Sequence, residues 1–323
     1  MERIGRPLVR GAASAVLGSV ALAAMGAACS TTQAPDPAAG AREPTSANAN
    51  ANANASATTN ANATTTTTTT TNADAEAGSV GAGRLAPLTA EGELVHLAVA
   101  GFRDAVVSLP TGATGPRPIL LALHGNFDRP EWQCEVWRGV TRARAFVVCP
   151  RGIPRPDAPR SLDRWTYGKG PAVRAEVEAA LTAVRARFER YVASGPVLYT
   201  GFSLGAIHGV GIVASDGGRY PRAVLVEGGH EGWTTARAKA YAAAGGKRVL
   251  FACGQRACKT DAALARKNLQ REGVETELVF GGEVGHTYDG PVAREIAHAW
   301  PWLVGDDPRW TDGEISGDRT QDK

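Results

Sequence analysis

The pentapeptide Gly-Phe-Ser-Leu-Gly at 201–205 constrains the fold of this chain more than any other feature. It directly follows the apolar run at 196–199, and apolar residues at helical spacing follow it. A serine on a sharp strand-to-helix turn presents its hydroxyl outside the sheet, and the flanking glycines give the crowded backbone room. The context predicts strand, turn and helix, with Ser203 as a candidate nucleophile. The alternative is a plain glycine-rich turn.

Apolar runs alternate with helix-period segments over the region around this turn. The residues Val173, Val177, Leu181, Val184 and Phe188 mark one face of a long helix, with Glu176 and Glu178 largely off that face. The predicted strands are 94–99, 105–109, 119–123, 145–149, 197–199, 223–226, 249–252 and 276–280. Strands that alternate with helices predict an α/β fold, with a mostly parallel central sheet and helices on both faces.

The N-terminus has the pattern of an export signal, with three arginines, an apolar stretch at 16–25 and small residues before Cys29. The small triplet ending at a cysteine resembles the bacterial lipobox, although Gly26 departs from it. We expect a lipoprotein signal peptide at 1–28 and lipidation of Cys29. Ordinary cleavage nearby and an uncleaved anchor are the alternatives. All three place the folded part outside the cytoplasm, in the bacterial cell envelope or secreted.

Composition divides the remainder of the chain. Residues 29–83 are almost all Ala, Asn, Thr, Pro and Ser, which cannot bury a core, so we expect a disordered tether. Residues 84–304 suit one α/β domain, and 305–323 form a polar C-terminal tail. The net charge is only +3 and no basic stripe is interleaved with aromatic residues. Nucleic acid is therefore not an expected partner, and we expect a monomer.

The chain has five cysteines, one near the N-terminus and four in the expected folded domain. If Cys29 carries the lipid, the remaining four can form two disulfides in an oxidising compartment. Three pairings are possible, and the local ones, Cys134 with Cys149 and Cys253 with Cys258, are favoured. Four buried free thiols are the alternative. No cysteine and histidine spacing matches a zinc site, so no metal is expected.

Two more features follow predicted strands. His286, in Gly-His-Thr-Tyr, comes after the last strand and is the best candidate for a general base. His124-Gly125-Asn126 follows the strand at 119–123 and has the pattern of an oxyanion loop. The backbone N–H groups of Asn126 and Leu204 are the candidate donors to a developing oxyanion. A simple strand-ending turn is the alternative at 124–126.

The triad acid is the open member of the set, because the loop after the strand at 249–252 carries no carboxylate at its start. Glu227 ends the preceding strand beside two glycines, and a glutamate there is costly to bury without a role. Asp261 comes later, but Thr260 and Asp261 also have the pattern of a helix N-cap before 262–271. Glu227 is favoured and Asp261 is the alternative. The acid would hold the tautomer of His286.

Three motifs together resemble those of the α/β-hydrolase superfamily, specifically its secreted serine esterases. They are Leu123-His124-Gly125-Asn126, the pentapeptide at 201–205 and Gly285-His286. The resemblance spans about 119–303 and implies an α/β-hydrolase fold, attack by Ser203 on an acyl carbonyl, an acyl-enzyme and no cofactor. It implies a small-molecule or lipid ester as substrate of a carboxylic ester hydrolase. A peptidase or amidase acting on envelope peptides, or a catalytically silent binding lipoprotein, is the alternative.

Overall fold

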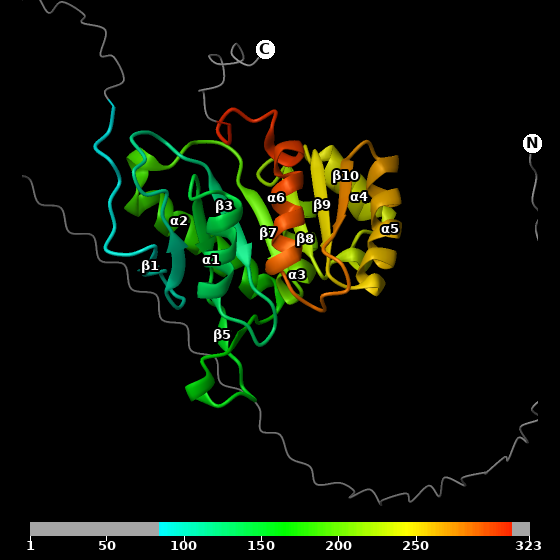
Figure 1. The fold of residues 1–323 in the computed structure, drawn as a ribbon, viewed down its shortest axis with the longest axis horizontal. Helices are drawn as coiled ribbons and strands as arrows, with labels where there is room; N and C mark the ends of the chain where they lie inside the picture. The colour runs from blue at the N-terminus through cyan, green and yellow to red at the C-terminus, as the bar shows by residue number, and fades with distance from the viewer. Residues whose placement is uncertain (1–83, 312–323) are drawn as a thin grey trace, which may run out of the picture. The chain divides into compact units, whose positions relative to one another are not determined.

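The computed structural model describes residues 84–311 (Figure 1). The expected signal peptide at 1–28, the lipidation of Cys29 and the tether at 29–83 lie outside the described residues. Within them, no helix is both long and apolar enough to cross a membrane. The strands are β1 (Leu94–Leu97), β2 (Ala105–Ser108), β3 (Ile119–Leu123), β4 (Phe146–Cys149), β5 (Ile153–Pro154), β6 (Trp165–Thr166), β7 (Leu198–Phe202), β8 (Arg222–Val226), β9 (Arg248–Cys253) and β10 (Glu275–Phe280).

An eight-stranded sheet organises the described part of the chain, in the order β1-β2-β4-β3-β7-β8-β9-β10. β2 pairs antiparallel with β1 and β4, and every other neighbouring pair in this sheet is parallel. The eight strands predicted from the sequence are all present, with ends shifted by no more than three residues. The predicted α/β-hydrolase fold is confirmed by this mostly parallel sheet and its flanking helices.

Helices cover both faces of the sheet (Figure 1). They are α1 (Pro130–Val140), α2 (Gly170–Arg187), α3 (Leu204–Ser215), α4 (Thr235–Ala243), α5 (Arg256–Arg271) and α6 (Gly290–Val304), with 3₁₀ turns η1 (Arg160–Leu162), η2 (Glu189–Tyr191) and η3 (His230–Gly232). α1 and α6 pack on one face, and α2, α3, α4 and α5 on the other. Alternate side chains along each buried strand point to opposite faces, so the apolar runs predicted as strands supply both cores.

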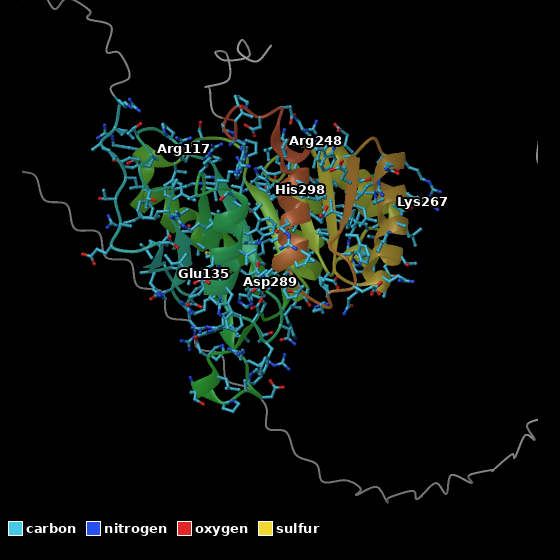
Figure 2. The ribbon with its side chains drawn as sticks, viewed as in Figure 1. Arg117, Glu135, Arg248, Lys267, Asp289 and His298 are labelled. Atoms are coloured by element: carbon cyan, nitrogen blue, oxygen red, sulfur yellow. A yellow bond between two sulfur atoms is a disulfide. The ribbon has the colours of Figure 1, made fainter. Side chains whose placement is uncertain are left out.

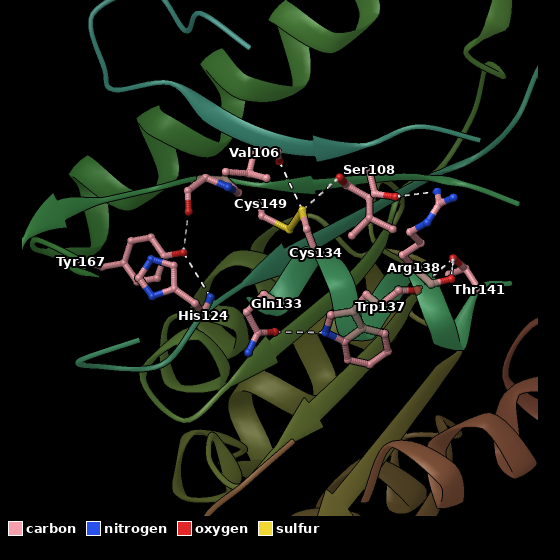
Figure 3. Close-up of a disulfide and its surroundings, with 12 residues drawn as sticks. Val106, Ser108, His124, Gln133, Cys134, Trp137, Arg138, Thr141, Cys149 and Tyr167 are labelled. Carbon is pink, nitrogen blue, oxygen red and sulfur yellow. Dashed lines mark hydrogen bonds between the residues drawn. A yellow bond between two sulfur atoms is a disulfide. The ribbon is translucent and has the colours of Figure 1, made fainter. Parts of the chain in front are cut away.

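Both local cysteine pairs form disulfides in the structure, as the sequence favoured. Cys134 of α1 joins Cys149 at the end of β4, which ties this helix to the sheet (Figure 3). Cys253, the last residue of β9, joins Cys258 in the first turn of α5. Each bond therefore staples a helix to the carboxyl-end region of a strand.

Two local expectations were wrong. α5 begins at Arg256 rather than at 262, so Thr260 and Asp261 lie inside the helix instead of capping it, and the Thr260 hydroxyl donates to the carbonyl of Arg256. Glu176 was placed largely off the buried face of its helix, but it is buried and accepts a hydrogen bond from the Gly152 N–H at 2.7 Å. A backbone donor from a distant loop explains how this carboxylate tolerates the interior.

Outside the large sheet, two segments extend the fold. β5 and β6 form a small antiparallel hairpin that protrudes from the body of the domain (Figure 1). At the C-terminal side, Trp310 packs edge-on against Trp300 of α6, with ring centroids 5.5 Å apart. The start of the polar tail is therefore docked on the domain.

Candidate active site

Ser203 occupies a strained turn between β7 and α3. Its φ of 50° and ψ of −111° lie where side chains other than glycine are rare. A Cβ on Gly201 would lie 2.5 Å from the backbone of Gly205, and a Cβ on Gly205 would lie 2.3 Å from the carbonyl oxygen of Leu123. Only glycine fits either position, because the turn brings the helix backbone against its own strand and against β3. The spacing of the pentapeptide thus has a steric cause.

Glu227 and His286 form a hydrogen-bonded pair at the carboxyl ends of β8 and β10. The Nδ1 atom of His286 lies 3.1 Å from Oε2 of Glu227. The Glu227 side chain is 2% exposed and that of His286 is 47% exposed, so the pair runs from the interior to the surface. Glu227 also has a left-handed φ of 51°, a second strained residue at this edge of the sheet. The arrangement fits a buried acid behind an accessible base.

Backbone hydrogen bonds align these site residues across the sheet. Residues that follow one strand donate backbone hydrogen bonds to the last residues of the neighbouring strand, so the ladder continues past the strand ends. The Ser203 N–H donates to the Val226 carbonyl at 2.9 Å, and the Glu227 N–H donates to the Ala252 carbonyl at 3.0 Å. The imidazole of His286 packs against Phe202, the residue before the serine, with ring centroids 4.9 Å apart. Among the described residues, no hydrogen bond joins the Ser203 hydroxyl to His286.

Asp261, the alternative acid, is not paired with His286. It lies within α5 and lines a cavity of about 560 Å³ that His286 and Glu227 also line. Its negative charge acts instead on His230. Burial lowers the pKa of His230, and the charge of Asp261 offsets part of that lowering. The structure therefore pairs Glu227, and not Asp261, with His286.

The other histidines engage groups away from Ser203. Burial lowers the pKa of His124, whose two ring nitrogens face the carbonyl oxygens of Gly125 and Arg151 at 2.7 and 2.9 Å. That ring is buried, and both of its nitrogens are directed at backbone carbonyl groups rather than at Ser203. His208 packs edge-on against Tyr167, His96 lies 3.1 Å from an Arg151 nitrogen, and His298 is exposed on α6 near Glu295 (Figure 2).

Two backbone N–H groups on the loops around Ser203 have no hydrogen-bond acceptor among the described residues. The N–H of Gly125 donates to Asp128 Oδ2 at 3.2 Å, and that of Gly205 donates to the His124 carbonyl at 3.1 Å. Asn126 follows Gly125, and Leu204 precedes Gly205. The N–H groups of Asn126 and Leu204 have no acceptor in the part of the chain that the structure describes. Leu204 is also the first residue of α3, where the helix dipole favours negative charge.

A buried network that sequence reasoning missed holds the loop at 124–128. Asp128 accepts hydrogen bonds from the Gly125 N–H and, at 3.2 Å, from the Tyr288 hydroxyl. The Tyr167 ring stacks on His124 at 4.3 Å between centroids, and its hydroxyl donates to the Pro150 carbonyl and accepts from the His124 N–H (Figure 3). Burial raises the pKa of both tyrosines, with Asp128 adding to the effect at Tyr288.

The only signal for this network in the sequence is weak. Asp128 lies two residues beyond the recognised His-Gly-Asn loop, and Tyr288 lies two beyond His286. Their pairing spans 160 positions, and nothing in the spacing of either residue indicates it. Proximity to a motif was the one available hint.

No protein-family model and no curated protein matches the chain. Several solved structures are similar to it. They include TT1662 from Thermus thermophilus (18% identity, 65% of this chain and 97% of that one, TM-score 0.46). They also include poly(aspartic acid) hydrolase-1 from Sphingomonas sp. KT-1 (14%, 66% and 98%, 0.44) and the Bacillus cereus carboxylesterase (14%, 64% and 95%, 0.43). At these identities and TM-scores, the function has to be argued from the chain's own residues.

Proposed function

We propose that this chain is a serine hydrolase that cleaves carboxylic esters through an acyl-enzyme on Ser203. The observation that carries the proposal is the Glu227–His286 hydrogen bond at the sheet edge where a strained serine precedes a helix. Strain at a non-glycine residue persists only where the surroundings impose it, and it concentrates at functional sites. Two such residues, Ser203 and Glu227, lie at the ends of adjacent strands.

In the first half of the reaction, the Ser203 Oγ attacks the ester carbonyl while His286 Nε2 takes its proton. Glu227 holds the Nδ1–H of the ring, which leaves Nε2 free to accept, and stabilises the imidazolium that forms. The carbonyl oxygen becomes an oxyanion, for which the N–H groups of Asn126 and Leu204 are the proposed donors. His286 then returns the proton to the departing alcohol, and the acyl group stays on Ser203.

In the second half, water replaces the alcohol. His286 takes a proton from the water as its oxygen attacks the acyl carbon, and the same two N–H groups stabilise the second oxyanion. Collapse breaks the bond to Ser203 Oγ, which recovers its proton from His286, and releases the carboxylic acid. The missing hydrogen bond between serine and base fits this scheme, because such contacts are often long before substrate binds and tighten in the complex.

Hydrolysis of short-chain nitrophenyl esters by the full chain tests the proposal. The Ser203→Ala variant is expected to lose turnover by up to about 10⁶-fold. Ser215→Ala, at the far end of the same helix, is a matched control that should keep full activity. Nitroanilides assayed in parallel separate an esterase from an amidase. Undiminished esterase activity in Ser203→Ala would disprove the mechanism.

We also propose that the enzyme is exported and anchored through lipid on Cys29, acting on ester substrates outside the cytoplasm. The signal-like N-terminus supports this, and so do two closed disulfides, which persist in oxidising compartments. Incorporation of labelled palmitate into the full chain in bacterial cells, absent from Cys29→Ala, is the expected result. Equal labelling of both forms would refute the anchor.

A further inference from the structure

The disulfide between Cys253 and Cys258 closes a short loop in the middle of the candidate site. Cys253 ends β9, and Cys258 lies in the first turn of α5. Gln255, the residue before this helix, makes no side-chain hydrogen bond to cap it. Helix starts are commonly fixed by such a cap, so the disulfide is the covalent tie that fixes where α5 leaves the strand.

This stapled loop supplies the donors that orient the acid. The backbone N–H groups of Gly254 and Gln255 both donate to Oε1 of Glu227, the second at 3.0 Å. The other carboxylate oxygen, Oε2, bonds to His286. One side of the carboxylate therefore rests on the loop while the other faces the base, so a shift of the loop turns the carboxylate relative to the imidazole.

The same loop holds the segment that carries the base. The carbonyl oxygen of Gly254 accepts hydrogen bonds from the N–H groups of Val284 and Gly285, both at 3.0 Å, and Gly285 directly precedes His286. The Cys253 carbonyl accepts from the Gly281 N–H at 2.9 Å. The contact is tight as well, because a Cβ on Gly254 would lie 2.5 Å from the Gly285 oxygen.

We propose that the Cys253–Cys258 disulfide is a positioning device for the catalytic pair, and that opening it with a thiol reductant lowers turnover reversibly. This inference rests on the proposed function. The loop closed by this disulfide carries the backbone groups that hold Glu227. It also carries the carbonyl groups that hold the segment at 281–285, which precedes His286. Misplacement of a catalytic group by about 1 Å can cost about 10²-fold in rate.

The two disulfides differ in access. Cys258 lines the 560 Å³ cavity beside His286, with its Sγ 3.4 Å from His230 Nε2. Both sulfurs of the Cys134–Cys149 pair belong to fully buried residues. A reductant entering the cavity therefore reaches Cys258 first, and the second pair serves as an internal control.

An external dithiol such as dithiothreitol supplies the two electrons that reduce the Cys253–Cys258 disulfide. One thiolate of the reagent attacks Sγ of Cys258, the Sγ–Sγ bond breaks, and Cys253 leaves as a thiolate that takes up a proton. The second thiol of the reagent then displaces Cys258 from the mixed disulfide. Two electrons pass to the protein, which gains two thiols, and the reagent becomes a cyclic disulfide.

The test is a titration of the full chain with dithiothreitol under native conditions, with alkylation and mass spectrometry to report which pair is open. Opening of the 253–258 pair is expected to lower kcat by about 10- to 100-fold, with KM changed by less than about 3-fold, and reoxidation should restore kcat. A purely structural role would lower the melting temperature without this selective and reversible loss of kcat. Full kcat with this pair open would overturn the inference.

Variants make the comparison independent of the reagent. Cys253→Ala with Cys258→Ala should show the low kcat and no further response to dithiothreitol. Cys134→Ala with Cys149→Ala should keep the wild-type kcat and the wild-type response. Failure of the proposed function is distinguished separately, since it would appear as undiminished activity in Ser203→Ala, whatever the state of the disulfides.

Discussion

Buried side chains hold the proposed oxyanion side of the site, whereas backbone groups and a disulfide hold the proposed acid–base side. After β3, the loop at 124–128 is fixed by Asp128, Tyr167 and Tyr288, all interior residues. After β9, the loop at 253–258 is fixed by peptide N–H and carbonyl groups and by a sulfur bridge.

The difference predicts how each side fails. Removing a side chain from the first leaves buried donors without acceptors, so stability and catalysis should fall together. Disturbing the loop at 253–258 changes the alignment of Glu227 with His286, while water in the cavity can replace the lost backbone hydrogen bonds. On this side, catalysis should therefore fall before stability does.

Replacement of the acid should give the largest effect. In Glu227→Gln the amide nitrogen would face His286 Nδ1 and favour the wrong tautomer, with the proton on the nitrogen that must accept from Ser203. We expect kcat for a nitrophenyl ester to fall about 10⁴-fold. Asp261→Asn is the matched control and should stay within about 2-fold of wild type. The opposite pattern would assign the acid to Asp261 and remove Glu227 from the mechanism.

Loss of the carboxylate on the oxyanion side should come next. Asp128→Ala leaves the Gly125 N–H and the Tyr288 hydroxyl without their acceptor. The loop that presents Asn126 would shift, so we expect kcat to fall by about 10²- to 10³-fold, as for a lost oxyanion donor. The free energy of unfolding should fall by about 1–3 kcal/mol for each unsatisfied group.

Tyr288→Phe is the milder change, because it removes a single one of the four donors to Asp128 and keeps the ring against Phe202. Its kcat and its denaturation midpoint should both lie between those of Asp128→Ala and wild type. A stability loss in Asp128→Ala without any change in kcat would show that this network does not position the proposed oxyanion loop.

The disulfide between α1 and β4 should affect stability alone. Cys134→Ala with Cys149→Ala is expected to lower the free energy of unfolding by about 3 kcal/mol, the chain-entropy value for a loop of this size. Urea denaturation measures the change, and kcat below the transition should be unchanged. A lower kcat would mean that the staple between α1 and β4 also aligns the site.

A buried carboxylate behind the oxyanion side should give the smallest effect. Burial raises the pKa of Glu176, partly offset by hydrogen bonds from backbone N–H groups such as that of Gly152. The folded chain therefore binds more protons at this group than the unfolded chain does. Its stability contribution is greatest at acid pH and declines as pH rises from about 4.5, the ordinary value, to the raised pKa.

Glu176→Gln cannot ionise, and its amide oxygen still accepts from Gly152. The variant should equal or exceed wild type in stability at pH 7, by less than about 1 kcal/mol, and lose this advantage below about pH 4. Denaturation midpoints across this pH range measure the difference. A variant that is less stable at pH 7 than at pH 4, relative to wild type, contradicts the sign.

The parts of this account that the sequence could predict are those written in short continuous segments. Buried strands are uniform apolar runs, and the two elbow glycines stand at fixed positions beside the serine, so the fold and the candidate nucleophile follow from local pattern. The pairing of Glu227 with His286 spans 59 positions and depends on the left-handed turn after β8. Residue types could rank Glu227 above Asp261 but could not place either carboxylate.

The two wrong local predictions concern the start of α5 and the burial of Glu176. Thr260-Asp261 has a capping pattern, yet α5 begins at Arg256, and Cys258 in its first turn is bonded to Cys253. Glu176 is a charged residue at a position that periodicity leaves half-exposed, and only the distant Gly152 N–H explains its burial. For Glu176, a contact from elsewhere in the chain overrides the local signal.

We propose that Ser203 is an activated nucleophile backed by His286 and Glu227. The most direct test is reaction of the full, disulfide-intact chain with a fluorophosphonate probe, followed by mass spectrometry to locate the adduct. The account predicts a single adduct on Ser203, formed far more slowly in Glu227→Gln and as fast as wild type in Asp261→Asn. A folded protein that forms no adduct at Ser203 would contradict the account and favour a binding protein that has the fold without the chemistry.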